Sequence, residues 1–305
     1  MFIDKLIKSI KEKKSSVVVG LDPRLEQIPD EIKSKYLNKY GETTLAVSKA
    51  FLEFNKGIID NIYDIVPAVK PQIAFYEMYG INGLIAYEET CRYAKDKGLL
   101  VIGDVKRGDI GSTSRAYSKA FIGETVIGDT CLNSFYSDCI TINPYLGDDC
   151  LREFIVDVDR HNKGIFVLVK TSNPSSSQVQ DLICDNRPIY EHVASMINNW
   201  SKDRIGEYGY SSVGAVIGAT YPSMLKSLRE LMPHTYFLVP GYGAQGGSAE
   251  DIRHSFNKDG LGALINSSRG IIFAYNNPKY SDLDYGEAAR RATLEMKEDI
   301  NRILL

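Results

Sequence analysis

The sequence has no long hydrophobic run and no apolar leader. Residues 1–14, MFIDKLIKSIKEKK, alternate apolar and charged side chains at helical spacing and lack the apolar core of about 7–15 residues typical of an export signal. The longest uncharged stretches, 208–225 and 231–249, are rich in Gly, Ser, Tyr and Pro and make poor bilayer helices. These absences predict a cytoplasmic protein that does not associate with a membrane.

Cysteine and histidine are both scarce, with five and four copies. The odd number of cysteines and the lack of any C-x-x-C pair exclude a zinc ribbon and predict reduced thiols rather than a disulfide framework. No H-x-H or H-E-x-x-H pair occurs, so we expect no metal site built from histidine. The net charge of −3, without a long basic block, argues against a nucleic-acid partner.

What the sequence does contain is a regular alternation of strand and helix patterns. Eight apolar, β-branched runs predict strands at residues 16–22, 67–71, 99–106, 139–144, 165–171, 213–220, 236–241 and 261–269. Amphipathic stretches such as 43–62 and 222–232 separate them, which indicates βαβ units and a parallel sheet. Eight units without a break in composition predict a single (β/α)8 barrel domain over residues 1–305. A doubly wound sheet would usually have fewer strands and a switch point.

Polar side chains gather at the carboxyl ends of these runs, which converge on one face of a barrel where active sites lie. They are Asp22, Lys70, Asp104, Lys106, Asn143, Lys170, Ser172, Gln245 and Arg269. Of these we expect Lys170 to form an ion pair at the rim rather than take part in chemistry. After the fifth run comes a polar loop of about 17 residues, 172–188, a length that predicts a lid over a ligand.

The most specific feature is DVKRGDIGST, residues 104–113. Because strand side chains alternate, Asp104 and Lys106 should share the face of Ile102 and point into the barrel mouth, about 7 Å apart along the strand. Asp109 follows in the loop, and Lys70 adds a cation from another strand end. The four charges alternate in sign and sum to zero, so they can stay ionised in a sheltered site. The alternative, a surface salt bridge worth at most about 1 kcal/mol, fits poorly with the apolar strands that precede them.

This charge pattern is suited to proton transfer. Flanking carboxylates favour the ammonium form of Lys106. A protonated lysine held against a reacting carbon is a general acid and also stabilises developing negative charge. We therefore predict that Lys70, Asp104, Lys106 and Asp109 form the catalytic group.

Glycines are concentrated in PGYGAQGG, residues 240–247, after the seventh predicted strand. The G-x-G-x-x-G within it is not followed, about 20 residues later, by the acidic residue of a dinucleotide site, so we reject that interpretation. Barrels commonly bind phosphate in the loops after strands seven and eight, and Arg269 at the end of the eighth can bind it bidentately. We predict a phosphate site here; the alternative is that the glycines only turn the chain.

Together, Asp104-x-Lys106-x-x-Asp109-Ile110, the upstream Asp22 and Lys70, PGYGAQGG and Arg269 resemble the orotidine 5′-phosphate decarboxylase family, in its longer bacterial branch. The resemblance runs over nearly the whole chain. It implies cofactor-free loss of CO2 from orotidine 5′-phosphate to give UMP, the last step of de novo pyrimidine nucleotide synthesis. It also implies a homodimer.

The resemblance further implies a role for each matching residue. Lys106 would protonate carbon 6 of the pyrimidine, Asp104 would lie against the departing carboxylate, and Lys70 would hold ribose and orient the network. Asp109, with Ile110 and Thr113, would reach the site of the neighbouring subunit. The implied substrate-binding set, for ribose, pyrimidine and phosphate, is Asp22, Ile110, Thr113, Ser172, Pro240, Gln245, Gly246 and Arg269.

Two positions depart from the family pattern. Gly111 follows Ile110 where many relatives carry proline, which predicts a less rigid loop. Ser268 precedes Arg269 where glycine is commoner, which weakens the expectation of a backbone contact to phosphate there. Neither position is ionisable, so the proposed charge roles are unaffected.

Two other functions remain as alternatives. A metal-dependent sugar-phosphate decarboxylase or synthase of the same superfamily keeps the Asp-x-Lys-x-x-Asp pattern, but carries an acidic magnesium ligand where this chain has Lys70. A non-catalytic barrel that binds a phosphorylated ligand would need only the glycine-rich loop and Arg269. Neither explains the four-charge group as well as cofactor-free decarboxylation does.

Overall fold

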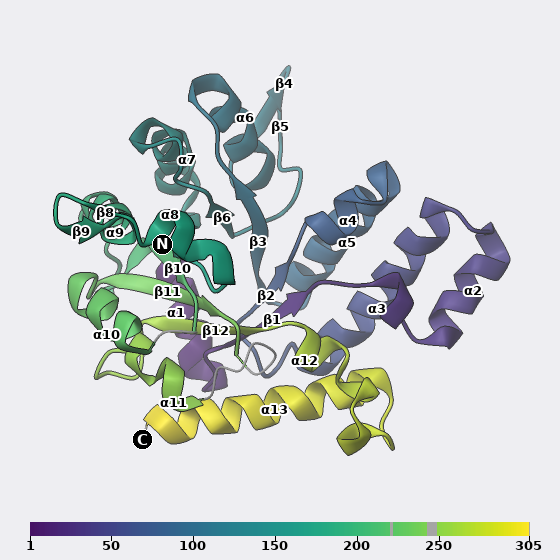
Figure 1. Cartoon of the computed structure of the whole chain (residues 1–305). Coiled ribbons are helices and arrows are strands. Elements are labelled where there is room, and N and C mark those ends of the chain that lie inside the picture. The colour runs from purple at the N-terminus through teal and green to yellow at the C-terminus, as the bar shows by residue number, and fades with distance from the viewer. Residues whose placement is uncertain (220–221, 243–248, 305) are drawn as a thin grey trace.

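The computed structural model describes residues 1–219, 222–242 and 249–304. Across these residues, eight parallel strands close into a barrel in the order β1, β12, β11, β10, β7, β6, β3, β2 (Figure 1). The strands are β1 (Val17–Leu21), β2 (Ala68–Pro71), β3 (Leu100–Arg107), β6 (Cys139–Ile142), β7 (Gly164–Lys170), β10 (Ser211–Ile217), β11 (Thr235–Pro240) and β12 (Ala263–Ser267). Each overlaps one predicted run, so the predicted (β/α)8 barrel is confirmed.

Helices follow the strands and cover the outside of the barrel (Figure 1). The longer ones are α2 (Asp30–Tyr40), α3 (Thr44–Ile62), α5 (Gly80–Asp96), α6 (Gly111–Phe121), α7 (Asp148–His161), α9 (Ile189–Ser201), α10 (Pro222–Leu231) and α13 (Tyr285–Leu304). Helix α3 begins where Thr43 accepts a hydrogen bond from the Ala46 amide, a favourable N-cap. Among the residues described, no helix is long and apolar enough to cross a membrane.

Alternation along the strands divides the apolar core into two layers. The inward-facing side chains, such as Ile102 and Phe166, cluster with the buried face of α1 (Phe2–Lys13). That helix fills the amino-terminal end of the barrel, where Phe2 packs against Gly164 at the start of β7. The outward neighbours, such as Val101, pack against the surrounding helices. With one end filled by apolar residues, the carboxyl end remains for polar side chains.

Two short hairpins interrupt the strand–helix alternation and were not predicted from the sequence. The strands β4 (Thr125–Ile127) and β5 (Thr130–Leu132) pair antiparallel and extend beyond α6 (Figure 1). The strands β8 (Ile183–Cys184) and β9 (Arg187–Pro188) are joined by Asp185 and Asn186, both with positive φ, as a type I′ turn requires. The second hairpin, with η2 (Pro174–Ser176) and α8 (Ser177–Gln180), gives regular structure to the predicted polar loop 172–188.

Candidate active site

Three predicted catalytic side chains meet at the carboxyl end of the barrel. Asp104 Oδ2 accepts a hydrogen bond from Lys70 Nζ at 2.7 Å, and Asp104 Oδ1 accepts one from Lys106 Nζ at 2.6 Å. The Lys70 and Asp104 side chains are 6% and 10% exposed, whereas Lys106 is 45% exposed. A ligand in the barrel mouth can therefore reach the Lys106 ammonium, while the other two groups stay sheltered.

The electrostatics of this group keep its charges in place. Burial alone would raise the pKa of Asp104, but the Lys70 and Lys106 ammonium groups hold it well below its ordinary range. Burial alone would lower the pKa of Lys70, but the carboxylates of Asp104 and Asp22 raise it above its ordinary value. Asp104 and Lys70 are therefore an anion and a cation at neutral pH, in a site where water screens them little.

Strand β3 departs from regular geometry at Lys106. Ile102 lies among the inward residues and Val101 and Val105 among the outward ones, as predicted. Beyond that point Lys106 takes a φ of +46°, a left-handed conformation that costs a non-glycine residue about 1–3 kcal/mol. The irregularity sets the direction in which the Lys106 ammonium leaves the strand.

A cavity of about 450 Å³ opens beside the charge group. Leu168, Val216, Leu238 and Pro240 form its apolar wall, and Lys70, Asp104, Lys106, Thr141, Thr171, Ser172, Asn173 and Gln180 contribute polar atoms. Its volume falls within the range of small-ligand sites, about 300–1,000 Å³. Gly218 permits the approach of Ser172, because a Cβ there would lie 2.8 Å from the Ser172 Cβ.

The loop after β7 is tied to the rim of this cavity. Gln180 Oε1 accepts a hydrogen bond from the Thr171 amide at 3.0 Å, and its Nε2 donates to Thr171 Oγ1 at 2.9 Å. Lys170 Nζ donates to Asp181 Oδ1 at 2.6 Å and to Ser176 Oγ at 3.0 Å. The expected ion pair of Lys170 is therefore present, but it forms from a buried position, 1% exposed, and anchors the loop.

A smaller cavity of about 190 Å³ continues from the first on the side of β1 and β12. It shares Lys70, Asp104 and Pro240 with the larger one and adds Asp22, Gly241, Tyr242, Asn266, Ser267, Ser268 and Arg269. Buried oxygens of Asp22 and Asn266 have no hydrogen-bond partner among the described residues, so both are free to accept bonds from a ligand. Gln245 and Gly246 lie outside the described residues.

Asp109, Ile110 and Thr113 line neither of these two cavities. Asp109 Oδ1 accepts a hydrogen bond from the Ile110 amide at 2.8 Å, and within the described part of the chain no bond or ion pair joins it to Lys106. Ile110 is 56% exposed. Gly111 has a φ of +46°, which proline cannot adopt. Glycine therefore suits the backbone conformation at this position, in addition to making the loop less rigid.

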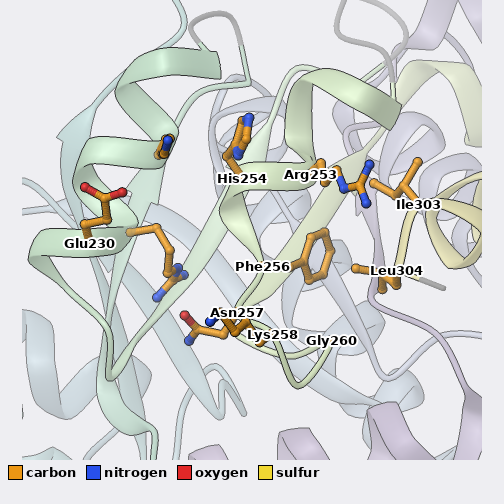
Figure 2. Close-up of a pocket in the computed structure, with 11 residues that line it drawn as sticks. Glu230, Arg253, His254, Phe256, Asn257, Lys258, Gly260, Ile303 and Leu304 are labelled. Atoms are coloured by element: carbon orange, nitrogen blue, oxygen red, sulfur yellow. The ribbon is translucent and has the colours of Figure 1, made fainter.

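A separate cavity of about 490 Å³ lies on the flank of the barrel, between α10, η3 (Arg253–Ser255) and the end of α13 (Figure 2). Figure 2 shows His254 and Arg253 above Phe256, with Ile303 and Leu304 on the side away from Glu230. The Arg229 guanidinium at its edge donates to the carbonyls of Met232, Thr235, Ser255 and Gly262, which is a structural role. None of the predicted site residues lines this cavity.

Sequence reasoning missed some residues of the site and included others that lie outside the two cavities. Thr141 and Asn266 line the cavities, although neither ends its predicted run. Strand periodicity could have found both, because each shares the inward face of its own strand, with Cys139 and with Leu264. Asn143 does end a run, but its Oδ1 accepts from the Tyr145 amide and it lines neither cavity. The described residues contain no group of three or more His, Cys, Asp or Glu placed to hold a metal ion.

The fold and the site define a (β/α)8 barrel with a lysine–aspartate–lysine group at its carboxyl end and ligand cavities on both sides of it. The model of the orotidine 5′-phosphate decarboxylase / HUMPS family matches residues 15–281, and the chain belongs to this family. It is 42% identical over 300 residues to orotidine 5′-phosphate decarboxylase of Caldicellulosiruptor bescii, with 98% of each chain covered. It is 44% identical over 290 residues to that of Rhodopirellula baltica, with 94% of each covered.

Solved structures agree with the family. The structure of Leishmania donovani OMP decarboxylase superimposes with a TM-score of 0.74 at 32% identity, covering 99% of this chain and 98% of that one. The likeness extends over the whole barrel, which confirms the resemblance inferred from the Asp104–Asp109 motif, Lys70 and the glycine-rich loop.

Proposed function

We propose that this chain is a carboxy-lyase that converts orotidine 5′-phosphate to UMP and CO2, the last step of de novo pyrimidine nucleotide synthesis. The observation that carries the proposal is the hydrogen-bonded array of Lys70, Asp104 and Lys106, placed between the two cavities. The larger cavity fits a pyrimidine ring, and the smaller one leads towards Arg269 and a phosphate. Family membership supports the same reaction.

The chemistry follows from the charges. Asp104 stays ionised, so it repels a substrate carboxylate beside it, and loss of neutral CO2 relieves that repulsion. The bond from carbon 6 to the carboxylate breaks, and its electron pair stays on carbon 6. Lys106 stabilises this carbanion and then donates a proton to carbon 6, which gives UMP; solvent returns a proton to the amine. No redox partner is needed, and we propose that the reaction uses no cofactor.

Substrate binding involves groups remote from the reacting carbon. We assign ribose hydroxyls to Asp22 and Lys70, and the pyrimidine to Ser172. We assign the phosphate to Arg269 and to three residues of the glycine-rich segment, Pro240, Gln245 and Gly246. Binding energy from phosphate can support closure and contacts made only in the transition state, rather than affinity alone.

We further propose a cytoplasmic homodimer, in which residues 1–305 form one catalytic domain. Asp109 lines neither cavity and Ile110 is exposed, which supports a site completed by a second copy, with Asp109, Ile110 and Thr113 crossing to the partner. A charged nucleotide substrate, made and used inside the cell, supports the cytoplasmic location. We assign the protein no nucleic-acid or membrane partner.

The decisive assay follows the ultraviolet change as orotidine 5′-phosphate becomes UMP, on protein treated with EDTA. Full turnover without metal is the expected result, because Lys106 supplies the proton and the positive charge from the chain itself. Activity that disappears with EDTA and returns with magnesium on a pentose or hexose phosphate would favour the metal-dependent alternative. Binding of the nucleotide without CO2 release would favour a non-catalytic barrel.

Arg269→Ala tests the phosphate end. Arg269 is exposed at the edge of the smaller cavity, so we expect the fold to be unaffected. Loss of a charge-assisted contact should raise KM and the Kd for UMP about 10–100-fold, in line with 1.5–3 kcal/mol for such a bond. Arg253→Ala in the flank cavity is the matched control, and isothermal titration with UMP is the measurement. Equal affinities in the two variants would remove Arg269 from the site.

A further inference from the structure

Thr141 lies where β6 meets the irregular end of β3, and every hydrogen-bonding site of its hydroxyl is occupied. Thr141 Oγ1 donates to Asp104 Oδ1 at 2.9 Å and accepts from the Val105 and Lys106 amides, both at 3.0 Å. A hydroxyl offers one donor and two acceptor sites, and all are occupied here. The side chain is 1% exposed, so water does not compete for them.

These bonds compensate for a break in the β3–β6 ladder. The pairing passes from Gly103 opposite Ile140 to Arg107 opposite Ile142, so four steps along β3 correspond to two along β6. The extra residues of β3 cannot all form the regular hydrogen bonds between the two strands. The amides of Val105 and Lys106 find their acceptor in the Thr141 hydroxyl, which leaves neither orphaned in the barrel wall.

We propose that Thr141 is a positioning residue for catalysis, which holds the Asp104 carboxylate and the left-handed Lys106 backbone in one fixed relation. The inference rests on the proposed decarboxylation and extends it beyond the charged residues. One hydroxyl is bonded both to the acid that faces the substrate carboxylate and to the main chain of the residue that donates the proton. A hydrophobic side chain of the same shape would fill the space but hold neither.

The geometry predicts that loss of the Thr141 hydroxyl slows the chemical step rather than weakening substrate binding. Lys106 has a φ of +46°, a conformation that its own side chain does not favour and that the surroundings must maintain. Without the Thr141 bonds, the backbone at Lys106 is free to move towards regular strand geometry, which redirects the ammonium group. Misplacement of a reacting group by about 1 Å costs about 100-fold in rate. Binding of phosphate and ribose, which uses other residues, should persist.

The test compares Thr141→Val with Thr141→Ser and with Thr235→Val. Valine removes the hydroxyl and keeps the shape, whereas serine keeps the hydroxyl. Thr235 is the matched control, because it is a fully buried barrel threonine whose Oγ1 has no partner among the described residues. We expect Thr141→Val to lower kcat about 100-fold, with KM and the Kd for UMP within about threefold of the wild type. Thr141→Ser should recover most of kcat, and Thr235→Val should leave it unchanged.

Amide hydrogen exchange supplies a second measurement. In Thr141→Val the Val105 and Lys106 amides should exchange faster than in the wild type, while their rates in Thr235→Val stay unchanged. A kcat for Thr141→Val equal to that for Thr235→Val overturns the proposal. If valine prevents folding, Thr141→Ala takes its place. If neither folds while Thr235→Val does, the hydroxyl is a folding requirement, and the positioning role is wrong. Absence of turnover in the wild type would instead contradict the proposed function itself.

Discussion

Replacing Lys106 by alanine is expected to abolish turnover while leaving a folded protein that still binds UMP. The substitution removes the proton donor and the cation nearest to the reacting carbon. General acid catalysis alone contributes about 10²–10⁴-fold, and the loss of charge stabilisation adds to it, so we expect kcat to fall by at least about 10⁴-fold. Initial rates at saturating orotidine 5′-phosphate, followed by ultraviolet absorbance, measure this directly.

Stability should change little in this variant. The Lys106 side chain is 45% exposed, and Asp104 keeps its bonds to Lys70 and Thr141 when Lys106 is lost. Asp104 therefore does not become a buried charge without a partner, which is the usual cause of a large loss of stability when an ion pair is broken. Circular dichroism and titration with UMP therefore serve as controls for fold and site. Wild-type kcat in a folded Lys106→Ala protein would remove Lys106 from its assigned role.

The barrel and the inner part of the site could be predicted from the sequence because both depend on strand periodicity. An apolar run that ends in Asp or Lys on the inward phase must place that charge at the barrel mouth, as Lys70 and Asp104 show. The same argument holds for Arg269, which follows the last strand and lines the smaller cavity. The alternation of inward and outward side chains can be read from the sequence of a single strand, so these placements need no knowledge of tertiary contacts.

The same periodicity gives the inward face of Thr141, but neither its role nor the irregular end of β3 could be predicted in this way. Thr141 sits in CITI, where a β-branched threonine is as typical of an ordinary strand as of a positioning group. Its role follows from the register shift between β3 and β6, and that shift is a property of two strands together. The left-handed backbone conformation of Lys106 could not be predicted either, since lysine has no local preference for positive φ.

Short hairpins carry too few residues for a period to be visible. The β8–β9 pair has two residues on each side, and only its Asp185-Asn186 turn distinguishes it from a polar loop.

The position of Asp109 is a different case. The charge pattern of the sequence predicts it in the catalytic group, but in this chain it lines neither cavity, so we expect any contribution from it to come through a second copy.

Mixing two inactive variants should restore activity if Asp109 acts across a dimer. Asp109→Ala and Lys106→Ala should each be inactive as homodimers. In a mixed dimer, the Asp109→Ala chain keeps its own Lys106 and receives Asp109 from the partner, so one of the two sites is complete. Random pairing makes about half of the dimers mixed, which gives about a quarter of wild-type activity. The measurement is kcat of the two proteins after joint denaturation and refolding in equal amounts.

The alternative arrangement gives the opposite result. If Asp109 served its own chain, the mixed dimer would have no complete site, because each chain would lack one of the two groups. Activity after mixing would then equal the average of the two inactive homodimers. Refolding each variant alone controls for recovery, and size-exclusion chromatography confirms that dimers re-form. Recovery to about a quarter is compatible only with the crossed arrangement, because each chain carries only one of the two required side chains and the complete site must draw on both.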